Sequence, residues 1–288
     1  MARILVTGSN GQLGSELRSL APDYSEHTFF FTDRDTLDIT DETAIEEFVK
    51  EYGADTIINS AAYTAVDKAE SDSEAADRVN HKAARVLAEV AKRHGAKLIH
   101  ISTDYVFDGR NFRPYIESDP TAPASVYGAT KCDGEKAIMT VNPKASIIVR
   151  TSWVYSSYGA NFLKTMLRLG KERDELGVIF DQVGTPTYAK DLARALLDII
   201  PDIKNSSVEI YHYSNEGVAS WYDFAKEIMS LAGNDCKVNA IETKAYPTPA
   251  SRPHYSLLNK SKIKEAFGID IPYWKESLKQ CLEQLGER

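Results

Sequence analysis

The chain has 288 residues, of which 43% are hydrophobic and 26% are charged. These values are typical of a folded globular protein and exclude a disordered, collagen-like or disulfide-scaffold chain. The 34 Lys and Arg residues are outnumbered by 42 Asp and Glu residues, so the net charge of −8 disfavours binding to nucleic acid. The length exceeds that of one average domain, and we expect a large domain with a smaller unit attached.

The cysteines and the N-terminal segment bear on the compartment. Cys132, Cys236 and Cys281 are odd in number and far apart, so they indicate neither a disulfide framework nor a zinc site. The first apolar run breaks at Gly8, too early for a signal-peptide core, and no apolar stretch approaches the roughly 18 residues of a membrane span. We therefore expect a cytoplasmic protein without a membrane partner.

The first half of the chain alternates between apolar runs and helical patterns. Strand character is found at residues 4–6, 28–32, 56–58, 97–101 and 146–149. Helical spacing is found between these runs, at residues 12–20, 41–52, 71–94 and 125–141. Buried strands that alternate with helices predict an α/β fold, a Rossmann-type doubly wound parallel sheet with helices on both faces.

Beyond about residue 151 the alternation is less regular. Helical patterns occur at 161–171, 190–200, 221–231 and 274–285, and strand patterns at 178–180 and 208–213. Three prolines exclude regular structure at 246–253. We predict an NAD(P)-binding domain over residues 1–150, which also receives elements from about 176–212, and a smaller α+β substrate lobe formed mainly by residues 151–288.

A glycine-rich turn joins the first strand to the first helix. Gly8, Gly11 and Gly14 follow G-x-x-G-x-x-G, the short-chain dehydrogenase variant of the dinucleotide-binding fingerprint. Glycines permit the tight turn, let a pyrophosphate approach the backbone and bring the helix close to the strand. The helix N-terminus offers free N–H groups to the phosphates. The pattern predicts dinucleotide binding, and an ordinary strand-to-helix turn is the alternative.

Two charged residues after the second strand bear on the choice of cofactor. Asp33 follows the glycine turn by about 20 residues, where a carboxylate accepts hydrogen bonds from the adenosine ribose and favours NAD. Arg34 is adjacent and would pair with the 2′-phosphate of NADP. We therefore expect both NADPH and NADH to serve. A solvated charge pair without ligand contacts is the alternative.

A strand-end hydroxyl and a Tyr-x-x-x-Lys pair form the candidate catalytic set. Thr103 follows the fourth strand, and Tyr127 and Lys131 share one face at the start of the next helix. We expect the Lys131 ammonium to lower the pKa of Tyr127, which would make the tyrosine an acid–base group, and to hold the nicotinamide ribose. Tyr222 and Lys226 repeat the spacing, but their helix has apolar core positions, so we expect a structural role.

The chain shows no pattern for a metal site or an acyl-transfer nucleophile. Its six histidines are scattered without H-E-x-x-H, and no serine stands in G-x-S-x-G. Trp153, Tyr155 and Tyr158 gather just after the fifth strand, at the sheet edge where ligands bind in such folds. Core packing is the alternative for this aromatic group.

Longer strings carry a more specific signal than the glycine turn. They are G-Q-L-G at 11–14, L-D-I-T at 37–40, N-S-A-A-Y-T-A-V-D at 59–67, S-T-D-Y-V-F-D-G at 102–109, V-Y-G at 126–128, R-T-S-W-V-Y at 150–155 and P-A-S-R-P at 249–253. On these strings the chain resembles the dTDP-4-dehydrorhamnose reductases, a family of extended short-chain dehydrogenase/reductases. The matches run through nearly its whole length.

The resemblance implies an activity and a set of contacts. It implies that NADPH or NADH reduces the 4-keto group of dTDP-4-dehydro-β-L-rhamnose to give dTDP-β-L-rhamnose, with Thr103, Tyr127 and Lys131 as the catalytic set. The cofactor contacts, including those expected from the glycine turn, are Gly8, Gly11, Gln12, Leu13, Gly14, Asp33, Arg34, Asp38, Ile39, Ala61, Ala62, Tyr63 and Thr64, with Tyr127 and Lys131. The residues expected against the sugar nucleotide are Thr103, Asp104, Tyr127, Trp153 and Arg252.

One position departs from the family pattern. Some members of the family dimerise through Mg²⁺ held by acidic residues on the first helix and on the helix after a G-x-P-T string. Glu16 matches the first position, but Lys190 stands where the second carboxylate is wanted, and an ammonium cannot ligate a hard cation. We therefore expect no Mg²⁺, and a monomer or a Mg²⁺-independent homodimer.

Two alternative functions fit the same fold. A non-catalytic subunit, similar to the regulatory subunit of methionine adenosyltransferase, would not need Thr103, Tyr127 and Lys131 together. A nucleotide-sugar epimerase or dehydratase would retain its cofactor through each cycle and carry a further acid–base pair after Thr103. The Asp104-Tyr105 sequence lacks the Asp-Glu pair of the dehydratase version.

Overall fold

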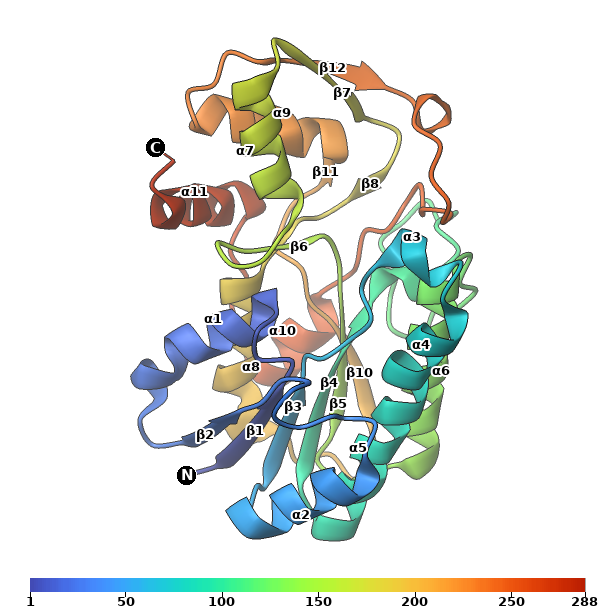
Figure 1. Cartoon of the computed structure of the whole chain (residues 1–288), viewed down its shortest axis with the longest axis vertical. Coiled ribbons are helices and arrows are strands. Elements are labelled where there is room, and N and C mark those ends of the chain that lie inside the picture. The colour runs from blue at the N-terminus through green and yellow to red at the C-terminus, as the bar shows by residue number, and fades with distance from the viewer. Residues whose placement is uncertain (288) are drawn as a thin grey trace.

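The protein is built on a six-stranded parallel sheet, which forms the larger of two lobes (Figure 1). The computed structural model describes residues 1–287. The strand order is β10-β5-β4-β3-β1-β2, and every neighbouring pair is parallel. The strands are β1 (Arg3–Thr7), β2 (Thr28–Phe31), β3 (Thr56–Asn59), β4 (Lys97–Thr103), β5 (Ile147–Thr151) and β10 (Glu209–His212). The predicted Rossmann-type sheet is confirmed.

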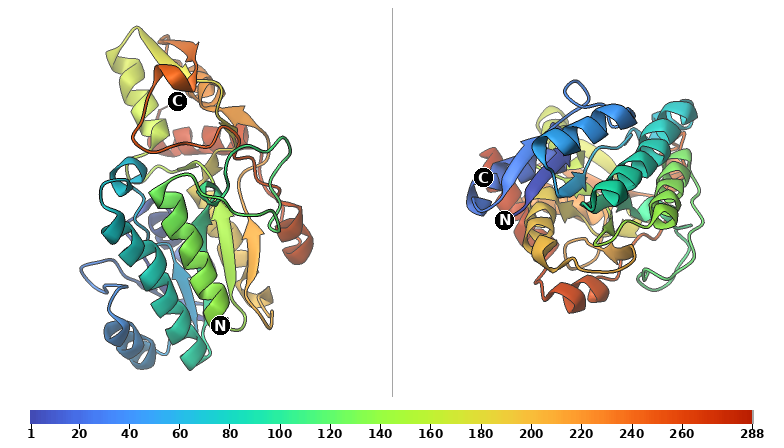
Figure 2. Two further views of the ribbon diagram at one scale, coloured as in Figure 1. Left: turned by 90° about the vertical axis from the view of Figure 1, so that its right-hand side faces the viewer. Right: turned by 90° about the horizontal axis from the view of Figure 1, so that it is seen from below.

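Helices cover both faces of this sheet because its strands bury side chains on both sides (Figure 2). In β1, Ile4 and Val6 face one apolar cluster while Leu5 faces the other. The first cluster is completed by α1 (Gln12–Leu20), α8 (Ala189–Ile199) and α10 (Ser261–Phe267). The second is completed by α2 (Glu42–Tyr52), α5 (Ala83–His94) and α6 (Val126–Val141).

The predicted helix at 71–94 is interrupted. It begins as α4 (Ser73–Asp77), continues through a π-helical turn over Arg78–Lys82 and ends as α5. A π turn inserts one residue per turn and is frequent at functional sites. Apolar spacing does not reveal such an insertion, because the helical rhythm resumes on either side of it.

The smaller lobe has its own apolar core (Figure 1). Its helices are α7 (Phe162–Glu172), α9 (Trp221–Leu231) and α11 (Trp274–Leu285). Its strands pair in twos, namely β7 (Glu175–Ile179) with β12 (Lys237–Ile241), β8 (Val183–Gly184) with β11 (Ala219–Ser220), and β6 (Val154–Tyr155) with β9 (Thr187–Tyr188). As predicted, residues 246–253 lie outside helices and strands.

Several elements of this half of the chain are additional to the predicted ones. Strand β12 and helix α10 are the longest of them, and the two-residue strands were not expected either. A single buried side chain, Val238 in β12 and Ile263 in α10, is too little to generate a readable period. Short elements that were not predicted also occur along the whole chain, namely α3 (Val66–Ala69) and the 3₁₀ turns at Ala21–Tyr24, Asp104–Val106, Ile200–Asp202 and Thr243–Ala245.

The chain passes between the lobes more than once. Helix α8, strand β10 and helix α10 follow elements of the smaller lobe in sequence, yet they pack with the large sheet. Strand β10 pairs along β5, with Glu209 opposite Ile147. Within residues 1–287, no helix is both long and apolar enough to cross a membrane.

Candidate active site

A cavity of about 1230 Å³ opens at the carboxyl ends of β1 to β5. This volume exceeds the roughly 300–1,000 Å³ of ordinary small-molecule sites, so it has room for more than one small ligand. Most residues predicted for the site line it, namely Gly8, Gly11, Gln12, Leu13, Asp33, Arg34, Asp38, Ile39, Ala61, Ala62, Tyr63, Thr64, Thr103, Asp104, Tyr127, Lys131 and Trp153. Gly14 and Arg252 are the two predicted residues that do not.

The glycine turn forms a cradle that side chains would fill. Gly8 has a φ of +67°, and a Cβ there would lie 2.7 Å from the Cα of Ala61. A Cβ on Gly14 would lie 2.5 Å from the Gly8 carbonyl oxygen, so this glycine brings α1 close to β1. Gly11 caps α1 without a side-chain hydrogen bond. The N–H groups of the first helical turn therefore remain available to a phosphate.

The loop after β3 is held by a residue that the sequence analysis did not identify. Asn80, in the π-helical turn, accepts a hydrogen bond from the Tyr63 N–H at 2.8 Å and donates one to the Tyr63 carbonyl at 3.1 Å. Its amide nitrogen also lies 3.2 Å from Thr130 Oγ1 on α6. A Cβ on Gly134 would lie 2.2 Å from the Asn80 carbonyl oxygen. The π turn thereby joins the Tyr63 loop to the helix that carries Tyr127 and Lys131.

At the far end of the cavity, the Asp33 carboxylate makes hydrogen bonds within its own loop. Asp33 Oδ1 accepts hydrogen bonds from the N–H groups of Asp35 and Thr36, at 3.0 and 3.2 Å, and Oδ2 accepts one from Asn10. Arg34 is exposed at the cavity edge.

A second arginine, Arg78, lines this end of the cavity as well. Hydrogen bonds from Thr40 hold the pKa of Asp38 below its ordinary value, and the charges of Arg34 and Arg78 lower this pKa further. Arg78 was not identified from the sequence. Only its place at the start of the π turn brings it here.

Thr103 and Tyr127 meet at the other end of the cavity. Thr103 is the last residue of β4, and its hydroxyl lies 3.0 Å from Asp104 Oδ1 and accepts a hydrogen bond from the Tyr105 N–H. Ser125 caps α6 by accepting from the Gly128 N–H at 3.1 Å, which sets Tyr127 in the first turn. The Tyr127 hydroxyl hydrogen-bonds to the Thr103 side chain.

Burial governs the protonation of both Tyr127 and Lys131. It raises the pKa of Tyr127 to about 12, although the hydrogen bond to Thr103 lowers this pKa. It lowers the pKa of Lys131 to about 8, and the nearby Glu135 carboxylate opposes this shift. Lys131 Nζ donates to the Ile101 carbonyl at 2.5 Å. The expectation that the ammonium brings the pKa of Tyr127 toward neutrality is therefore wrong for this structure, in which burial is the largest influence on that pKa.

Asp104 presents an unsatisfied oxygen in the same region. Its side chain is 2% exposed, and Oδ2 has no hydrogen-bond partner among the described residues. Burial raises the pKa of Asp104 to about 6, and a hydrogen bond from Ser256 lowers this pKa. A buried carboxylate oxygen without a donor is costly, so a ligand hydroxyl at this position would be stabilised.

Trp153 lines the cavity in a strained backbone conformation. Its φ is +50°, a region that costs a residue with a side chain about 1–3 kcal/mol and persists only when the surroundings hold it. The indole stacks on Trp221 of α9, with ring centroids 3.7 Å apart and planes 10° from parallel. A Cβ on Gly184 would lie 3.0 Å from the Trp153 ring. The smaller lobe therefore fixes this side chain.

Arg252 is held away from the cavity lining. Its guanidinium makes a two-pronged ion pair with Asp67, at 3.0 and 2.8 Å, and the Ala250 N–H also donates to Asp67. The pair ties the proline-containing segment 246–253 to α3 of the larger lobe. Unlike the other residues predicted to bind the substrate, Arg252 therefore does not line the cavity.

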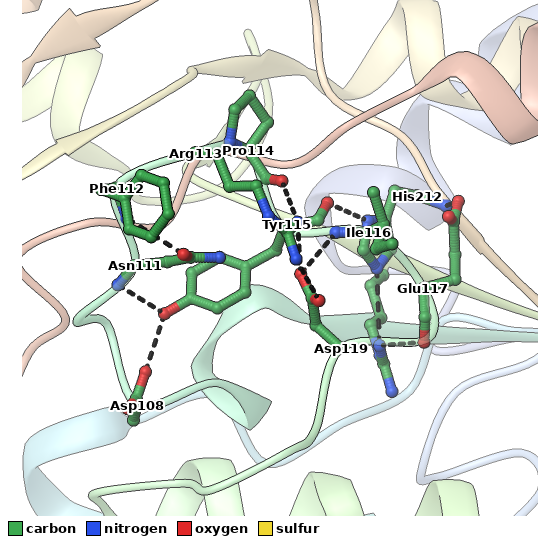
Figure 3. Close-up of polar contacts among 11 residues, drawn as sticks. Asp108, Asn111, Phe112, Arg113, Pro114, Tyr115, Ile116, Glu117, Asp119 and His212 are labelled. Carbon is green, nitrogen blue, oxygen red and sulfur yellow. Dashed lines mark hydrogen bonds and ion pairs between the residues drawn. The ribbon is translucent and has the colours of Figure 1, made fainter.

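The loop over residues 108–119, whose polar contacts Figure 3 shows, lies against the end of the same segment. The Tyr115 hydroxyl donates to Asp108 at 2.8 Å and accepts from the N–H groups of Arg110 and Asn111. Its ring stacks on Phe107 at 4.1 Å. The Gly109 carbonyl accepts a hydrogen bond from the Tyr255 N–H, and a Cβ on Gly109 would lie 2.4 Å from Pro253. This loop therefore fixes the end of segment 246–253.

Glu16, the residue considered for Mg²⁺, is fully buried on α1. It accepts a hydrogen bond from Ser156 at 2.6 Å, and burial raises its pKa while the Lys190 charge lowers it. Asp191 instead accepts from Asn215 and Ser277. Residues 1–287 contain no group of three or more His, Cys, Asp and Glu residues arranged to hold a metal ion. The expectation about Mg²⁺ stays a prediction.

Comparison with known proteins agrees with this site. Residues 2–287 match the family model described as the RmlD substrate binding domain. The dTDP-4-dehydrorhamnose reductase of Aggregatibacter actinomycetemcomitans is 45% identical, over 97% of this chain and 98% of that relative. The chain belongs to this reductase family. The resemblance noted in the sequence is thereby confirmed.

Two solved structures of the family extend the match to three dimensions. A dTDP-4-dehydrorhamnose reductase from Clostridium acetobutylicum is 44% identical, covers 99% of both chains and superposes with a TM-score of 0.93. The enzyme from Bacillus anthracis, solved in complex with NADP, is 40% identical, covers 98% of this chain and 99% of that chain, and gives a TM-score of 0.92.

Proposed function

We propose that the protein reduces the 4-keto group of dTDP-4-dehydro-β-L-rhamnose to a hydroxyl, which completes dTDP-β-L-rhamnose. The observation that carries the proposal is a single cavity that joins the glycine turn to Thr103, Tyr127 and Lys131. The family relatives named for this reaction support it. In class, the protein is an NAD(P)H-dependent oxidoreductase acting on CH–OH groups. Its three cysteines are buried free thiols, which fits a reducing cytoplasm.

The residues around the glycine turn fit a dinucleotide. NADPH or NADH, when bound, supplies the hydride. Gly8 and Gly11 leave the backbone open to a pyrophosphate, and α1 directs its first N–H groups there. Asp38, Arg34 and Arg78 border the adenosine end. The family member from Bacillus anthracis was crystallised with NADP, which supports the same use here.

Tyr127 is the proton donor in this proposal. With a pKa of about 12, its hydroxyl keeps its proton at neutral pH and can give it to the oxygen of a ketone undergoing reduction. Thr103 shares a hydrogen bond with that hydroxyl and fixes its direction. Lys131, from the next turn of α6, stabilises the phenolate that remains.

Asp104 and Trp153 account for binding of the sugar. Asp104 Oδ2 can accept a hydrogen bond from a sugar hydroxyl, because it has no partner within the described chain. The Trp153 indole supplies a flat apolar surface against which a deoxysugar packs. Arg252 would reach the sugar nucleotide only after leaving Asp67.

Net consumption of NADPH with each candidate keto sugar tests the proposal. We expect one NADPH oxidised for each dTDP-4-dehydrorhamnose reduced, measured by loss of nicotinamide absorbance and by identification of the product. An epimerase or dehydratase would show no net consumption. A non-catalytic subunit would bind cofactor without turnover. Either result would contradict the proposal.

A further inference from the structure

A line of buried polar side chains crosses the sheet and ends at Lys131. Thr7 Oγ1 lies 2.7 Å from Asn59 Oδ1, and Asn59 Nδ2 lies 2.9 Å from His100 Nδ1. His100 Nε2 lies 3.3 Å from Lys131 Nζ. All four side chains are between 0 and 2% exposed. Such groups are costly to bury unless their hydrogen bonds are complete, so this line is a built feature of the sheet.

The register of the sheet produces this line. Thr7 pairs with Asn59 between β1 and β3, and Asn59 pairs with His100 between β3 and β4. Directly paired residues of neighbouring strands point to the same face of a sheet. Lys131 then reaches the His100 ring from α6, which packs against β4.

The protonation state of Lys131 is tied to the tautomer of His100. Burial holds the pKa of His100 well below its ordinary value, so the ring is neutral and has one donor and one acceptor nitrogen. Nε2 accepts from the Lys131 ammonium only if Nδ1 carries the proton. This requires the Asn59 amide to be turned by about 180° around its Cβ–Cγ bond from the orientation in the structure, where Nδ2 faces His100 Nδ1 and Oδ1 faces Thr7. The Thr7 hydroxyl can pair with either end of the amide. The other tautomer places Nε2–H against Nζ and suits only a neutral amine.

Two protein acceptors therefore face the three N–H donors of the ammonium. They are His100 Nε2 and the Ile101 carbonyl oxygen, at 3.3 and 2.5 Å, so one N–H remains for the cavity. The other titratable groups around Lys131 are Glu135 on α6, which is held in a two-pronged pair by Arg150, and Tyr127. Asp104 acts on Tyr127 from the end of β4.

We propose that His100 is a positioning residue, which accepts a hydrogen bond from the Lys131 ammonium and keeps it charged beside the cavity. This inference rests on the proposed function for its catalytic meaning. The bond itself exists whether or not the protein reduces a keto sugar. A merely structural histidine would fill space in the sheet and leave the protonation of Lys131 unchanged.

The titration of Lys131 tests the proposal without substrate. In protein labelled with ¹³Cε-lysine, the Lys131 signal is assigned by its loss in Lys131→Arg and followed against pH. We expect a pKa near 8 in the wild type and a decrease of about one to two pH units in His100→Leu, as loss of a hydrogen bond to a charged group predicts. His100→Gln keeps an acceptor and should restore most of the shift. An unchanged pKa in a folded His100→Leu protein would overturn the proposal.

A second measurement needs no change at His100 and so does not depend on how that variant folds. ¹⁵N shifts of histidine side chains report which ring nitrogen carries the proton. Below the pKa of Lys131 we expect His100 as the Nδ1–H tautomer, and an Nε2–H tautomer there would contradict the proposal. Lys131→Met should alter the His100 signals. His212 is a buried histidine beside Arg150, and its signals should not change.

Kinetics separate this inference from the proposed function. If the wild type reduces the keto sugar, His100→Leu should raise the KM for NADPH and move the pH profile of kcat, and His100→Gln should recover both. If the wild type reduces no keto sugar while the Lys131 pKa still depends on His100, the proposed function fails and the hydrogen bond stands. If activity is present but substitution of His100 changes neither the KM for NADPH nor the pH profile of kcat, its positioning role fails.

Discussion

Tyr127 combines two properties that rarely occur together, a high pKa and a fixed direction toward a ligand cavity. Burial keeps the hydroxyl protonated, and Thr103 and the Ser125 cap fix its place. A phenol in this state suits proton donation during reduction. It suits proton removal at neutral pH poorly, so we expect the reductive direction to be favoured.

Replacement of Tyr127 by Phe should remove the donor and little else. We expect kcat to fall by about 10² to 10⁴-fold, the usual contribution of general acid catalysis, with cofactor affinity nearly unchanged. Steady-state kinetics and a cofactor titration measure the two effects. Tyr222→Phe is the matched control, because Tyr222 is partly buried and packs against the core of the smaller lobe. Retention of more than about a tenth of the wild-type kcat would show that the proton comes from elsewhere.

We expect Arg34 and Asp33 to make the choice of cofactor loose. Arg34→Ala should weaken NADPH by up to about fivefold, the range of an exposed ion pair, and should weaken NADH less. Binding titrations with both cofactors give the comparison. An equal loss for both would show that Arg34 does not face the 2′ position.

The Asp104 carboxyl should make stability depend on pH. Its pKa of about 6 exceeds the ordinary value of 3.8, so the folded protein holds this proton more tightly than the unfolded chain does. The free energy of unfolding should therefore fall as pH rises from about 4 to 6, by on the order of 3 kcal/mol from this group. In Asp104→Asn that part of the slope should vanish, which urea unfolding at several pH values measures. An identical slope in the variant would refute this account.

At the scale of elements, the helices and strands near the glycine turn were predictable because their signals are local. Gly8 to Gly14 mark both the turn and the helix start, and the apolar runs of β1, β3, β4 and β5 are buried on both faces. The π turn, Asn80 and Arg78 could not be predicted, because a one-residue insertion leaves the apolar period intact. The stacking of Trp221 on Trp153 could not be predicted for another reason, because the two residues are distant in sequence.

The contact between α6 and the π turn should be sensitive to one methyl group. A Cβ on Gly134 would lie 2.2 Å from the Asn80 carbonyl oxygen, a backbone atom that cannot move alone. Gly134→Ala should lower the free energy of unfolding by about 1–3 kcal/mol and weaken cofactor binding, because both elements border the cavity. Denaturant unfolding and a cofactor titration measure these effects.

Gly170 in α7 provides the control for this substitution. A Cβ there would meet the flexible end of Met229, at 2.7 Å from its sulfur atom, so the neighbour can give way. Gly170→Ala should change stability by less than about 1 kcal/mol. Equal losses in the two variants would mean that any added methyl in a helix is harmful and that the π turn has no special role.

At the scale of the whole molecule, the fold class followed from the alternation of strands and helices, and we predicted that elements from about 176–212 join the first domain. The later return of α10 to the large sheet was not predicted. Strand β10 is placed in the large sheet by pairing with β5, and helix α8 is placed on it by the apolar cluster that it shares with β1 and β5. The division at residue 150 into a cofactor domain and a substrate lobe therefore stays a prediction. The position of Arg252 on Asp67 likewise depends on contacts between remote segments.

The assembly of the protein should not require magnesium. The Lys190 charge already acts on the Glu16 carboxylate and would repel an approaching Mg²⁺, while Asp191 is engaged by Asn215 and Ser277. Sedimentation velocity with excess Mg²⁺ and with EDTA should give the same species, a monomer or a Mg²⁺-independent dimer. A dimer that dissociates only on chelation would restore Glu16 as a metal ligand.

The late return of α8, β10 and α10 to the large sheet has a consequence during synthesis on the ribosome. When the first 150 residues have emerged, one face of β1 and β5 has helix α1 but still lacks α8 and α10, which cover the rest of it. The last of these helices ends at Phe267. At roughly 5–20 residues per second, the nascent chain exposes this face for on the order of ten seconds. During that interval we expect chaperones to bind the exposed apolar face of the nascent chain. A prematurely terminated chain would keep this face exposed, and proteases would recognise it.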